Sequence, residues 1–265
     1  MTMPMKPDAL SANHEKRVPA VTVAVGAAPT RASNSASKSA SKSASIAGSA
    51  RGPMQSPAKE RAKVAAIKTT IFLLCLVPLL RLIGLGLADK LTSNPIEFIT
   101  RSTGTWTLVM LCITLAVTPL RRVLGWNGVL RYRRMLGLFA FFYGALHFTT
   151  YIWFDQWFDL IDIGKDIVKR PFVTVGFAAF VLMVPLALTS NSYAIRKLGR
   201  RWSLLHRLIY PVAIAAILHY LWHKGGKNNY TEPLMYAAVV ATLFAVRLTY
   251  WWRARSARSN VKSVK

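Results

Sequence analysis

Hydrophobic residues along this chain are gathered into blocks that begin after Lys68 and alternate with basic loops. Each block is long enough to cross a bilayer with some tilt. No alternation with a period of two, which is typical of strands, competes with them. The pattern predicts an all-helical fold, a polytopic membrane bundle of six transmembrane helices. These helices are expected at residues 69–88, 104–120, 135–154, 171–189, 203–222 and 233–251. Pro78, Pro185 and Pro211 fall inside three of them, where proline is tolerated and kinks the helix.

The rest of the chain divides around this membrane domain. Residues 1–67 are rich in Ala, Ser and Lys and include a tandem SASK repeat. Such a segment cannot bury enough apolar surface to offset its ordering entropy, so it is predicted to be disordered. The transmembrane domain covers residues 68–252, and a basic tail, expected in the cytoplasm, covers residues 253–265.

Composition narrows the class further. The chain is 53% hydrophobic and carries a net charge of +25. A soluble nucleic-acid-binding protein would not be this apolar, so the charge indicates basic loops and tails of a membrane protein. Cys75 and Cys112 lie singly within apolar blocks, which favours small core residues over a disulfide framework or a thiolate metal site.

Lysine and arginine counts predict the orientation. The N-terminal tail, the loops 121–134 and 190–202 and the C-terminal tail hold 25 of them, whereas the alternate loops hold 7. Cytoplasmic loops retain positive charge, so both termini are expected in the cytoplasm. The loop from Trp153 to Pro171 carries four aspartates among aromatic residues, which is typical of a helix lying on the outer membrane surface.

Three of the five histidines lie in the block from Arg200 to Lys224. Ionisable residues inside a membrane span are costly, and they indicate a functional site. His206 and His219 are 13 residues apart, which separates them by roughly 20 Å along a helix and places one near each membrane face. His223 follows one turn after His219 and is interpreted as a wet interfacial residue.

A second histidine lies at the depth of His219. His147 lies 13 residues beyond Arg134, and His219 lies 18 beyond Arg201, so both are expected in the outer half of the bilayer. Two imidazoles at one depth on neighbouring helices can clamp a haem iron from opposite sides, which suits electron transfer and not oxygen chemistry. The alternative is that each histidine only forms hydrogen bonds between helices.

The inner level lacks a matching pair. Arg134, beside Arg133, stands where a partner for His206 would be expected. The 13-residue spacing also turns an ideal helix by about 220°, so His206 and His219 share a face only if Pro211 distorts the helix. One bis-histidine haem is therefore predicted, with His206 serving another purpose or a weaker second site. Arg207, Arg133 and Arg134 are candidates to meet haem propionates, lipid phosphates or a quinone, with lipid as the default.

Six stretches of the chain carry a family resemblance. They are NPIEFITRSTGTWTL from Asn94, TPLRR from Thr118, RRMLGLFAFFYGALHFTTY from Arg133, KRPFVTVGF from Lys169, LALTSN from Leu186 and KLGRRWSLLHRLIYPVAIAAILHYLW from Lys197. In this order and spacing they resemble the MsrQ (YedZ) family, within the ferric reductase-like transmembrane group. The resemblance spans roughly residues 68–252 and leaves out the N-terminal tail.

The resemblance implies a haem b subunit in the bacterial inner membrane, with FMN as a further cofactor. It implies that electrons pass from the quinone pool to MsrP, a periplasmic molybdopterin enzyme that reduces methionine sulfoxide in proteins. The family's haem histidines correspond to His147 and His219, with His206 as the third family histidine, and no residue is assigned to the flavin. Electrons would enter from a quinol or a cytoplasmic flavin reductase and leave at the outer face.

Other classes of function are weighed against this reading. A ferric or oxygen reductase of the same group normally continues into a flavin and nicotinamide domain, but 13 residues follow Trp252 and carry no glycine-rich phosphate loop. A transmembrane electron carrier with another external acceptor stays as the alternative. A proton-coupled transporter predicts acidic residues inside the spans, whereas Asp89 and Glu97 lie at or beyond a span's end. A purely structural subunit is the remaining option.

Overall fold

A computed structural model describes residues 57–226 and 229–263, and in these ranges the chain is helical, without a strand. Six helical segments are long and apolar enough to cross a membrane, which confirms the predicted all-helical, multi-pass bundle. They are Ala58–Leu87, Pro95–Leu124, Asn127–Asp155, Pro171–Leu188, Arg200–Gly225 and Thr231–Ser256. The predicted disordered tail lies outside the described residues up to residue 56, and residues 57–67 are helical.

Each predicted span corresponds to one main helix. These are α1 (Pro57–Leu87), α2 (Pro95–Leu124), α3 (Leu130–Thr150), α5 (Pro171–Leu188), α8 (Ile209–Gly225) and α9 (Thr231–Ser263). Shorter helices connect them: η1 (Asn127–Val129), η2 (Tyr151–Asp155), α4 (Leu160–Lys169), α6 (Ser192–Leu198), α7 (Arg200–Leu205) and η3 (His206–Leu208).

Local sequence signals define several helix ends. Asn94 caps α2 by accepting a hydrogen bond from the backbone N–H of Glu97 at 3.1 Å, and proline follows it at the first helical position. Gly125 ends α2 in the left-handed conformation (φ +67°), which glycine adopts without a steric penalty. Asp159 caps α4 by accepting hydrogen bonds from the N–H groups of Ile161 and Asp162.

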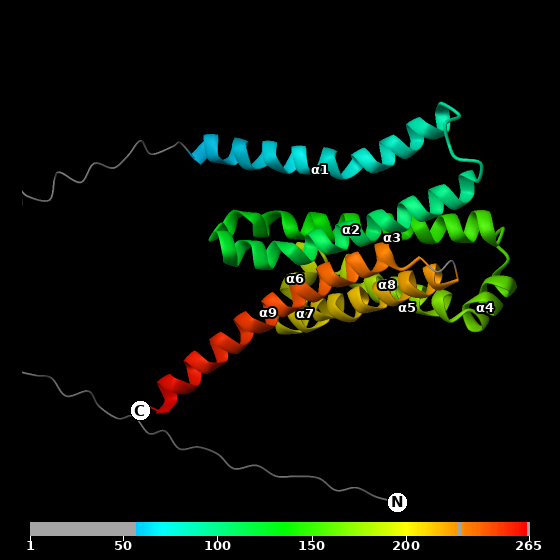
Figure 1. Cartoon of the computed structure of the whole chain (residues 1–265). Coiled ribbons are helices and arrows are strands. Elements are labelled where there is room, and N and C mark those ends of the chain that lie inside the picture. The colour runs from blue at the N-terminus through cyan, green and yellow to red at the C-terminus, as the bar shows by residue number, and fades with distance from the viewer. Residues whose placement is uncertain (1–56, 227–228, 264–265) are drawn as a thin grey trace, which may run out of the picture. The chain divides into compact units, whose positions relative to one another are not determined.

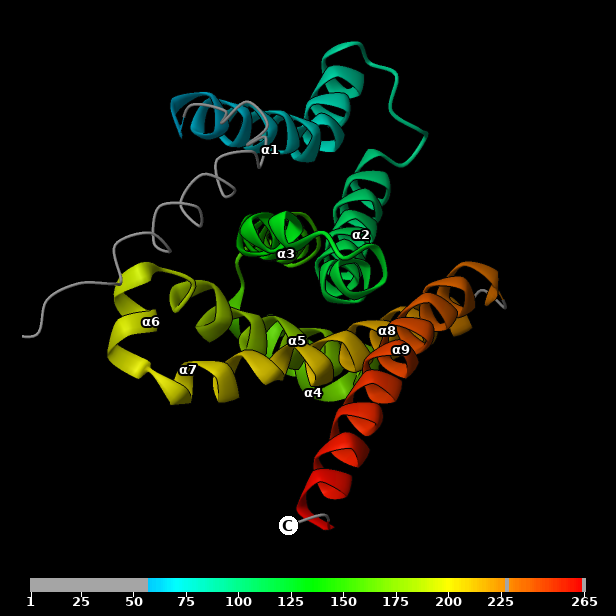
Figure 2. The same cartoon turned by 90° about the vertical axis from the view of Figure 1, so that its left-hand side faces the viewer.

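The helices pack chiefly as two antiparallel pairs, α2 with α3 and α5 with α8. Helix α9 packs against α2 and α8, while α1 makes fewer contacts, mainly with α3. Figure 1 shows these helices lying lengthwise, with α4 at one end of the bundle and α6 and α7 at the other. We call these the α4 end and the α7 end. Figure 2 looks along the bundle and shows the two pairs side by side.

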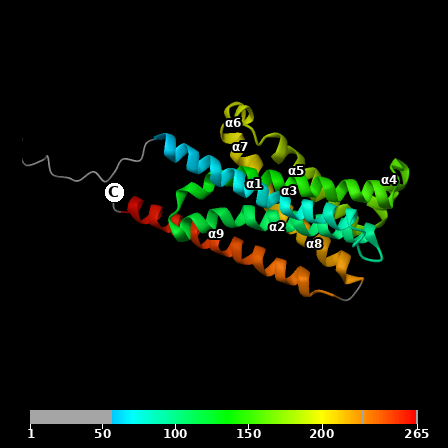
Figure 3. The same ribbon diagram turned by 90° about the horizontal axis from the view of Figure 1, so that it is seen from above.

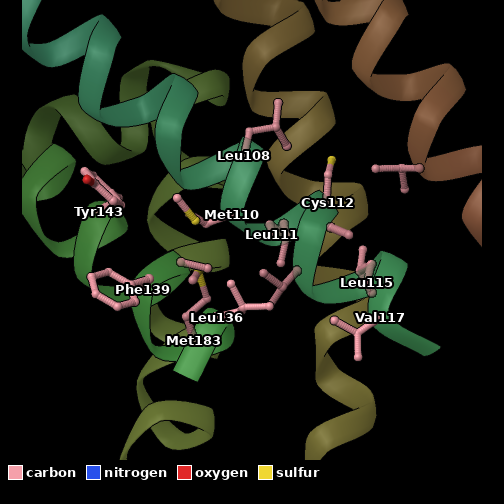
Figure 4. Packing of buried hydrophobic residues seen from close by; sticks show 14 of the residues in the cluster. Leu108, Met110, Leu111, Cys112, Leu115, Val117, Leu136, Phe139, Tyr143 and Met183 are labelled. Carbon is pink, nitrogen blue, oxygen red and sulfur yellow. The ribbon is translucent and has the colours of Figure 1, made fainter. Parts of the chain in front are cut away.

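The core lies between the two pairs. Leu111 and Leu115 of α2 and Val212 of α8 have no exposed surface, and Figure 4 shows Leu136, Phe139 and Met183 gathered around the same helix α2. Cys75 and Cys112 are both buried and unpaired. Tyr143 is 1% exposed, and its hydroxyl donates to the carbonyl oxygen of Cys75 at 2.7 Å, which ties α3 to α1.

Many apolar side chains lie exposed on the outside of the bundle, as expected of helices that face lipid. On α1 the exposed set includes Phe72, Leu73, Leu74, Val77 and Leu80. Clustered exposure of this kind marks a surface that another apolar phase covers. The length and hydropathy of the span Ala58–Leu87 indicate that this phase is the lipid bilayer.

The fifth span is not one continuous helix. Helix α7 ends at Leu205, residues 206–208 form the 3-10 turn η3, and α8 begins at Ile209. Pro211 lies in the first turn of α8, where its missing N–H costs nothing, and its ring would clash with the carbonyl of Arg207 in an unbroken helix. A 3-10 turn has three residues per turn in place of 3.6, so η3 changes the direction in which His206 points relative to His219. Seen from above, α7 lies on one side of α2 and α3, and α8 emerges on the other side (Figure 3).

Candidate functional site

His147 of α3 and His219 of α8 face each other across the bundle. Their ring centroids are 6.1 Å apart, and the ring planes meet at 71°. The two residues come from different helix pairs, so the imidazoles meet where α2–α3 packs against α5–α8. The structure therefore brings these two candidate residues together, and it leaves His206 elsewhere.

The His147 ring is fixed by the neighbouring helix α2. Its Nδ1–H donates to the carbonyl oxygen of Thr100 at 2.9 Å. One turn further along α2, Gly104 lies under the same ring, and a Cβ at this position would lie 3.1 Å from the ring's Nδ1. A Cβ here would require the ring to shift by a few tenths of an ångström, so glycine leaves the ring its space. The bond at Nδ1 leaves Nε2 as the nitrogen available to a ligand.

His219 is fixed in the same way by helix α5. Its Nδ1–H donates to the carbonyl oxygen of Phe172 at 2.7 Å. Gly176, again four residues after the acceptor, lies under the ring, and a Cβ there would come within 2.6 Å of Nδ1. Each histidine follows its acceptor by 47 residues. The two helix pairs therefore build one local motif twice.

Both rings line a cavity of about 1090 Å³ at the α4 end, which we call the histidine cavity. Its polar wall includes Arg101 and Lys224, which pair with Glu97 and Glu232 at 2.5 Å and 3.1 Å. Arg101 also has a buried Nε atom without a hydrogen-bond partner. His223 lines the same cavity, and its ring centroid lies 5.7 Å from that of Phe172.

His206 lines a second cavity, of about 460 Å³, at the α7 end. We call it the arginine cavity because Arg133, Arg134 and Arg207 lie on its wall. The His206 Nδ1–H donates to the carbonyl oxygen of Trp202 at 3.1 Å, and Nε2 lies 3.5 Å from the Ser190 hydroxyl. The ring stacks on Trp202 with centroids 4.0 Å apart. No second histidine lines this cavity within the described residues.

The two cavities share a wall made by Leu111 and Met183. Because both residues belong to the central core, His206 and His219 line neighbouring parts of the same interior. The sequence left their relative direction dependent on a distortion near Pro211. The 3-10 turn that begins at His206 is that distortion.

The described part of the chain holds no group of three or more His, Cys, Asp or Glu residues that could bind a bare metal ion. A two-histidine arrangement instead suits a metal that brings most of its donor atoms with it. Sequence reasoning missed the backbone acceptors Thr100 and Phe172 and the glycines Gly104 and Gly176. The signal that could have found them is their equal spacing, since each glycine precedes its histidine by 43 residues.

Comparison with known proteins gives the family. The model of the ferric reductase like transmembrane component matches residues 103–217. The chain is 53% identical over 195 residues, 73% of its length and 89% of the relative's, to the "Protein-methionine-sulfoxide reductase heme-binding subunit MsrQ" of Herminiimonas arsenicoxydans. It is 56% identical over 196 residues, 74% of its length and 89% of the relative's, to the protein of the same name from Ralstonia nicotianae.

A more distant relative of that name, from Azospira oryzae, is 48% identical over 209 residues, 76% of this chain and 89% of the relative. No solved structure matches the chain. The identities hold over most of each relative's length, and the range of the family model contains α3 and α5 in full and parts of α2 and α8. The chain therefore belongs to the MsrQ family of heme-binding subunits of protein-methionine-sulfoxide reductase systems.

Proposed function

We propose that this protein is a membrane haem b electron-transfer subunit that serves a periplasmic methionine sulfoxide reductase. The observation that carries the proposal is the facing pair of His147 and His219, each with Nδ1 held by a backbone carbonyl. The names of its relatives, which call them heme-binding subunits, support the choice of cofactor.

The residues present fit a haem between the two rings. Two metal–nitrogen bonds of about 2 Å, plus about 1 Å from each nitrogen to its ring centre, add to about 6 Å. The observed centroid separation is 6.1 Å. The histidine cavity extends around both rings, and Arg101, Arg170 and Lys224 on its wall would supply cations for the propionates of a bound haem.

The protein's own residues determine what such a site does. The carbonyls of Thr100 and Phe172 hold both imidazoles in the tautomer whose Nε2 is free to ligate. A haem iron held by both histidines would suit electron transfer and not oxygen or substrate chemistry. Bound haem b would supply a one-electron couple. His147 and His219 therefore act as a pair of ligands for electron transfer, and no residue of the site is assigned a catalytic role.

The direction of transfer follows from the charge distribution. Basic loops at the α7 end favour the cytoplasm, and the few lysines and arginines in the loops at the α4 end favour the periplasm. Both termini are then cytoplasmic, in the inner membrane, and the histidine cavity lies nearer the periplasmic face. Electrons would leave there for the catalytic subunit MsrP. The donor, by family resemblance, is the quinone pool or a cytoplasmic flavin reductase.

Two cofactor assignments stay predictions. FMN is implied by the resemblance alone, and no described residue is assigned to it. His206 is a further candidate ligand of a second, weaker haem site, but no other histidine of the described residues lines the arginine cavity. We therefore propose a single haem, ligated by His147 and His219.

The test uses membranes that contain the full chain, reduced beforehand, mixed with purified MsrP and methionine sulfoxide. Reoxidation of the low-spin haem band is expected only when both are added. The second candidate is a ferric reductase-like carrier with another external acceptor, which the ferric reductase family match favours. If the haem is reoxidised equally fast without MsrP, or equally well by external ferric iron, the ferric reductase-like carrier replaces the first proposal.

A further inference from the structure

Among the described residues, none that lines the arginine cavity is acidic. Its lining residues come from stretches 104–154 and 171–231, which contain no Asp or Glu. The ion pairs given for the described residues all lie elsewhere, at Arg101, Lys165, Arg170 and Lys224. Arg133, Arg134 and Arg207 thus meet no carboxylate within the described chain. A cation at the edge of a membrane interior normally has a partner, so the counter-charge has to come from another molecule.

A fourth guanidinium strengthens the positive field around this cavity. Arg247 of α9 donates through Nη1 to the Tyr210 hydroxyl at 2.9 Å and through Nη2 to the Leu115 carbonyl at 2.5 Å. Tyr210 is part of the cavity wall. The charge of Arg247 is therefore fixed behind this wall, and its hydrogen bonds engage neutral oxygens that leave the charge uncompensated.

The arginine cavity is lined by both guanidinium groups and apolar side chains. Arg133 is half-buried, whereas Arg134 and Arg207 are exposed, so the cationic groups lie at the cavity's opening. Phe141, Met183 and Ile209 line its apolar part, and the stacked rings of Trp202 and His206 form a flat side. The occupant that fits has an anionic head and an apolar body.

We propose that the arginine cavity binds a phosphate-bearing amphiphile, with the phosphate among Arg133, Arg134 and Arg207 and the apolar part against Met183 and Ile209. Guanidinium forks match phosphate oxygens in a bidentate manner, which favours this head group over a single point charge. The same chemistry is offered by a membrane phospholipid and by a soluble phosphate-bearing ligand. This inference stands apart from the proposed haem site, which lies in the other cavity.

The experiment uses the full chain in a maltoside detergent, which carries no phosphate, and measures binding by isothermal titration calorimetry. The two probes are short-chain phosphatidylglycerol and inorganic phosphate. The cavity variant carries Arg133→Gln, Arg134→Gln and Arg207→Gln. The matched control carries Arg131→Gln, Arg196→Gln and Arg201→Gln, which removes the same charge from exposed positions outside the cavity.

We expect saturable binding to the wild-type chain that weakens about tenfold or more in the cavity variant and persists in the control. Phosphatidylglycerol binding that inorganic phosphate does not displace identifies a lipid head group, and displacement identifies a soluble phosphate ligand. An equal loss in the control, or no binding to wild type, would overturn the proposal. The low-spin haem spectrum should be unchanged in the cavity variant. Loss of phosphate binding can then be distinguished from loss of the haem site.

The single substitution Arg133→Lys gives a second measurement if the triple variant fails to fold. It keeps the charge and removes the planar fork. We expect binding to weaken, although the net charge is unchanged. Unaltered affinity in this variant would contradict head-group recognition by the guanidinium.

Discussion

Gly176 lies directly under the imidazole of His219, so close that a Cβ at this position would come within 2.6 Å of Nδ1. That distance is shorter than real carbon contacts, so any side chain would displace the ring or its hydrogen bond to Phe172. A Cβ at Gly104 would likewise lie 3.1 Å from Nδ1 of His147, which is a tight contact but a less severe one. A side chain at Gly176 should therefore disturb its histidine more than one at Gly104.

The first prediction uses this grading. Gly176→Ala should lower haem affinity by about 10- to 100-fold, as loss of ligand positioning does at metal sites, and Gly104→Ala should lower it less. Haem titration of the purified apoprotein, followed at the Soret band, measures both. Gly84→Ala is the matched control, because nothing lies within 4 Å of a Cβ at Gly84 in α1. Equal effects at Gly176 and Gly84 would contradict the positioning role.

The second prediction concerns the ligands themselves. His147→Ala or His219→Ala should abolish the low-spin haem signal, because each substitution removes one of two axial nitrogens. His206→Ala should leave that signal largely intact, since His206 lines the other cavity. Absorption and electron paramagnetic resonance spectra of the purified variants measure this. A haem that survives in His147→Ala but disappears in His206→Ala would show that the pair is wrongly assigned.

The third prediction is the orientation. A reporter fused after residue 195, in α6, should be active in the cytoplasm, and one fused after residue 160, in α4, should be active only when exported. The reason is the excess of 25 basic residues over 7 on the two sides. Paired cytoplasmic and periplasmic reporters at both positions provide the measurement. An exported reporter at the C-terminus would reverse the proposed direction of electron flow.

The fourth prediction addresses Arg247, which links α9 to the rest of the bundle. Its guanidinium donates to Tyr210 of α8 and to the backbone of α2 at Leu115. Arg247→Ala should destabilise the protein by about 2 kcal/mol, because two hydrogen bonds from a charged group are lost and the carbonyl of the buried Leu115 loses this partner. Thermal unfolding in detergent measures the change, with the exposed Arg253→Ala as its control. A melting temperature unaltered by Arg247→Ala would rule out this anchoring.

Much of the fold could be predicted from the chain alone. Membrane helices satisfy their own backbone hydrogen bonds, so hydropathy and length are enough to locate all six spans. The histidines stood out for the same reason, because an ionisable side chain within an apolar run is rare and costly. Depth along each helix then singled out His147 and His219, and these rings do lie side by side.

The ends of the helices were predicted less accurately than the spans themselves. The first and last helices extend past the predicted spans, from Pro57 and to Ser263. Hydropathy marks the part of a helix that suits lipid, whereas a helix continues into water wherever its backbone bonds persist. The break at His206 was also uncertain, because Pro211 is compatible with either a kink or an interruption.

The amino-acid sequence by itself thus determined the number of spans, their apolar character and the two histidines at matching depth, because these depend on each segment's own transfer from water to lipid. Only the tertiary structure decided what surrounds them. Thr100 and Gly104 reach His147, and Phe172 and Gly176 reach His219, through contacts between helices whose rotation hydropathy does not specify. Likewise Arg133, Arg134 and Arg207 were visible as basic residues, but their shared cavity arises because helix packing brings distant segments to one space. No carboxylate from the described part of the chain lines that space.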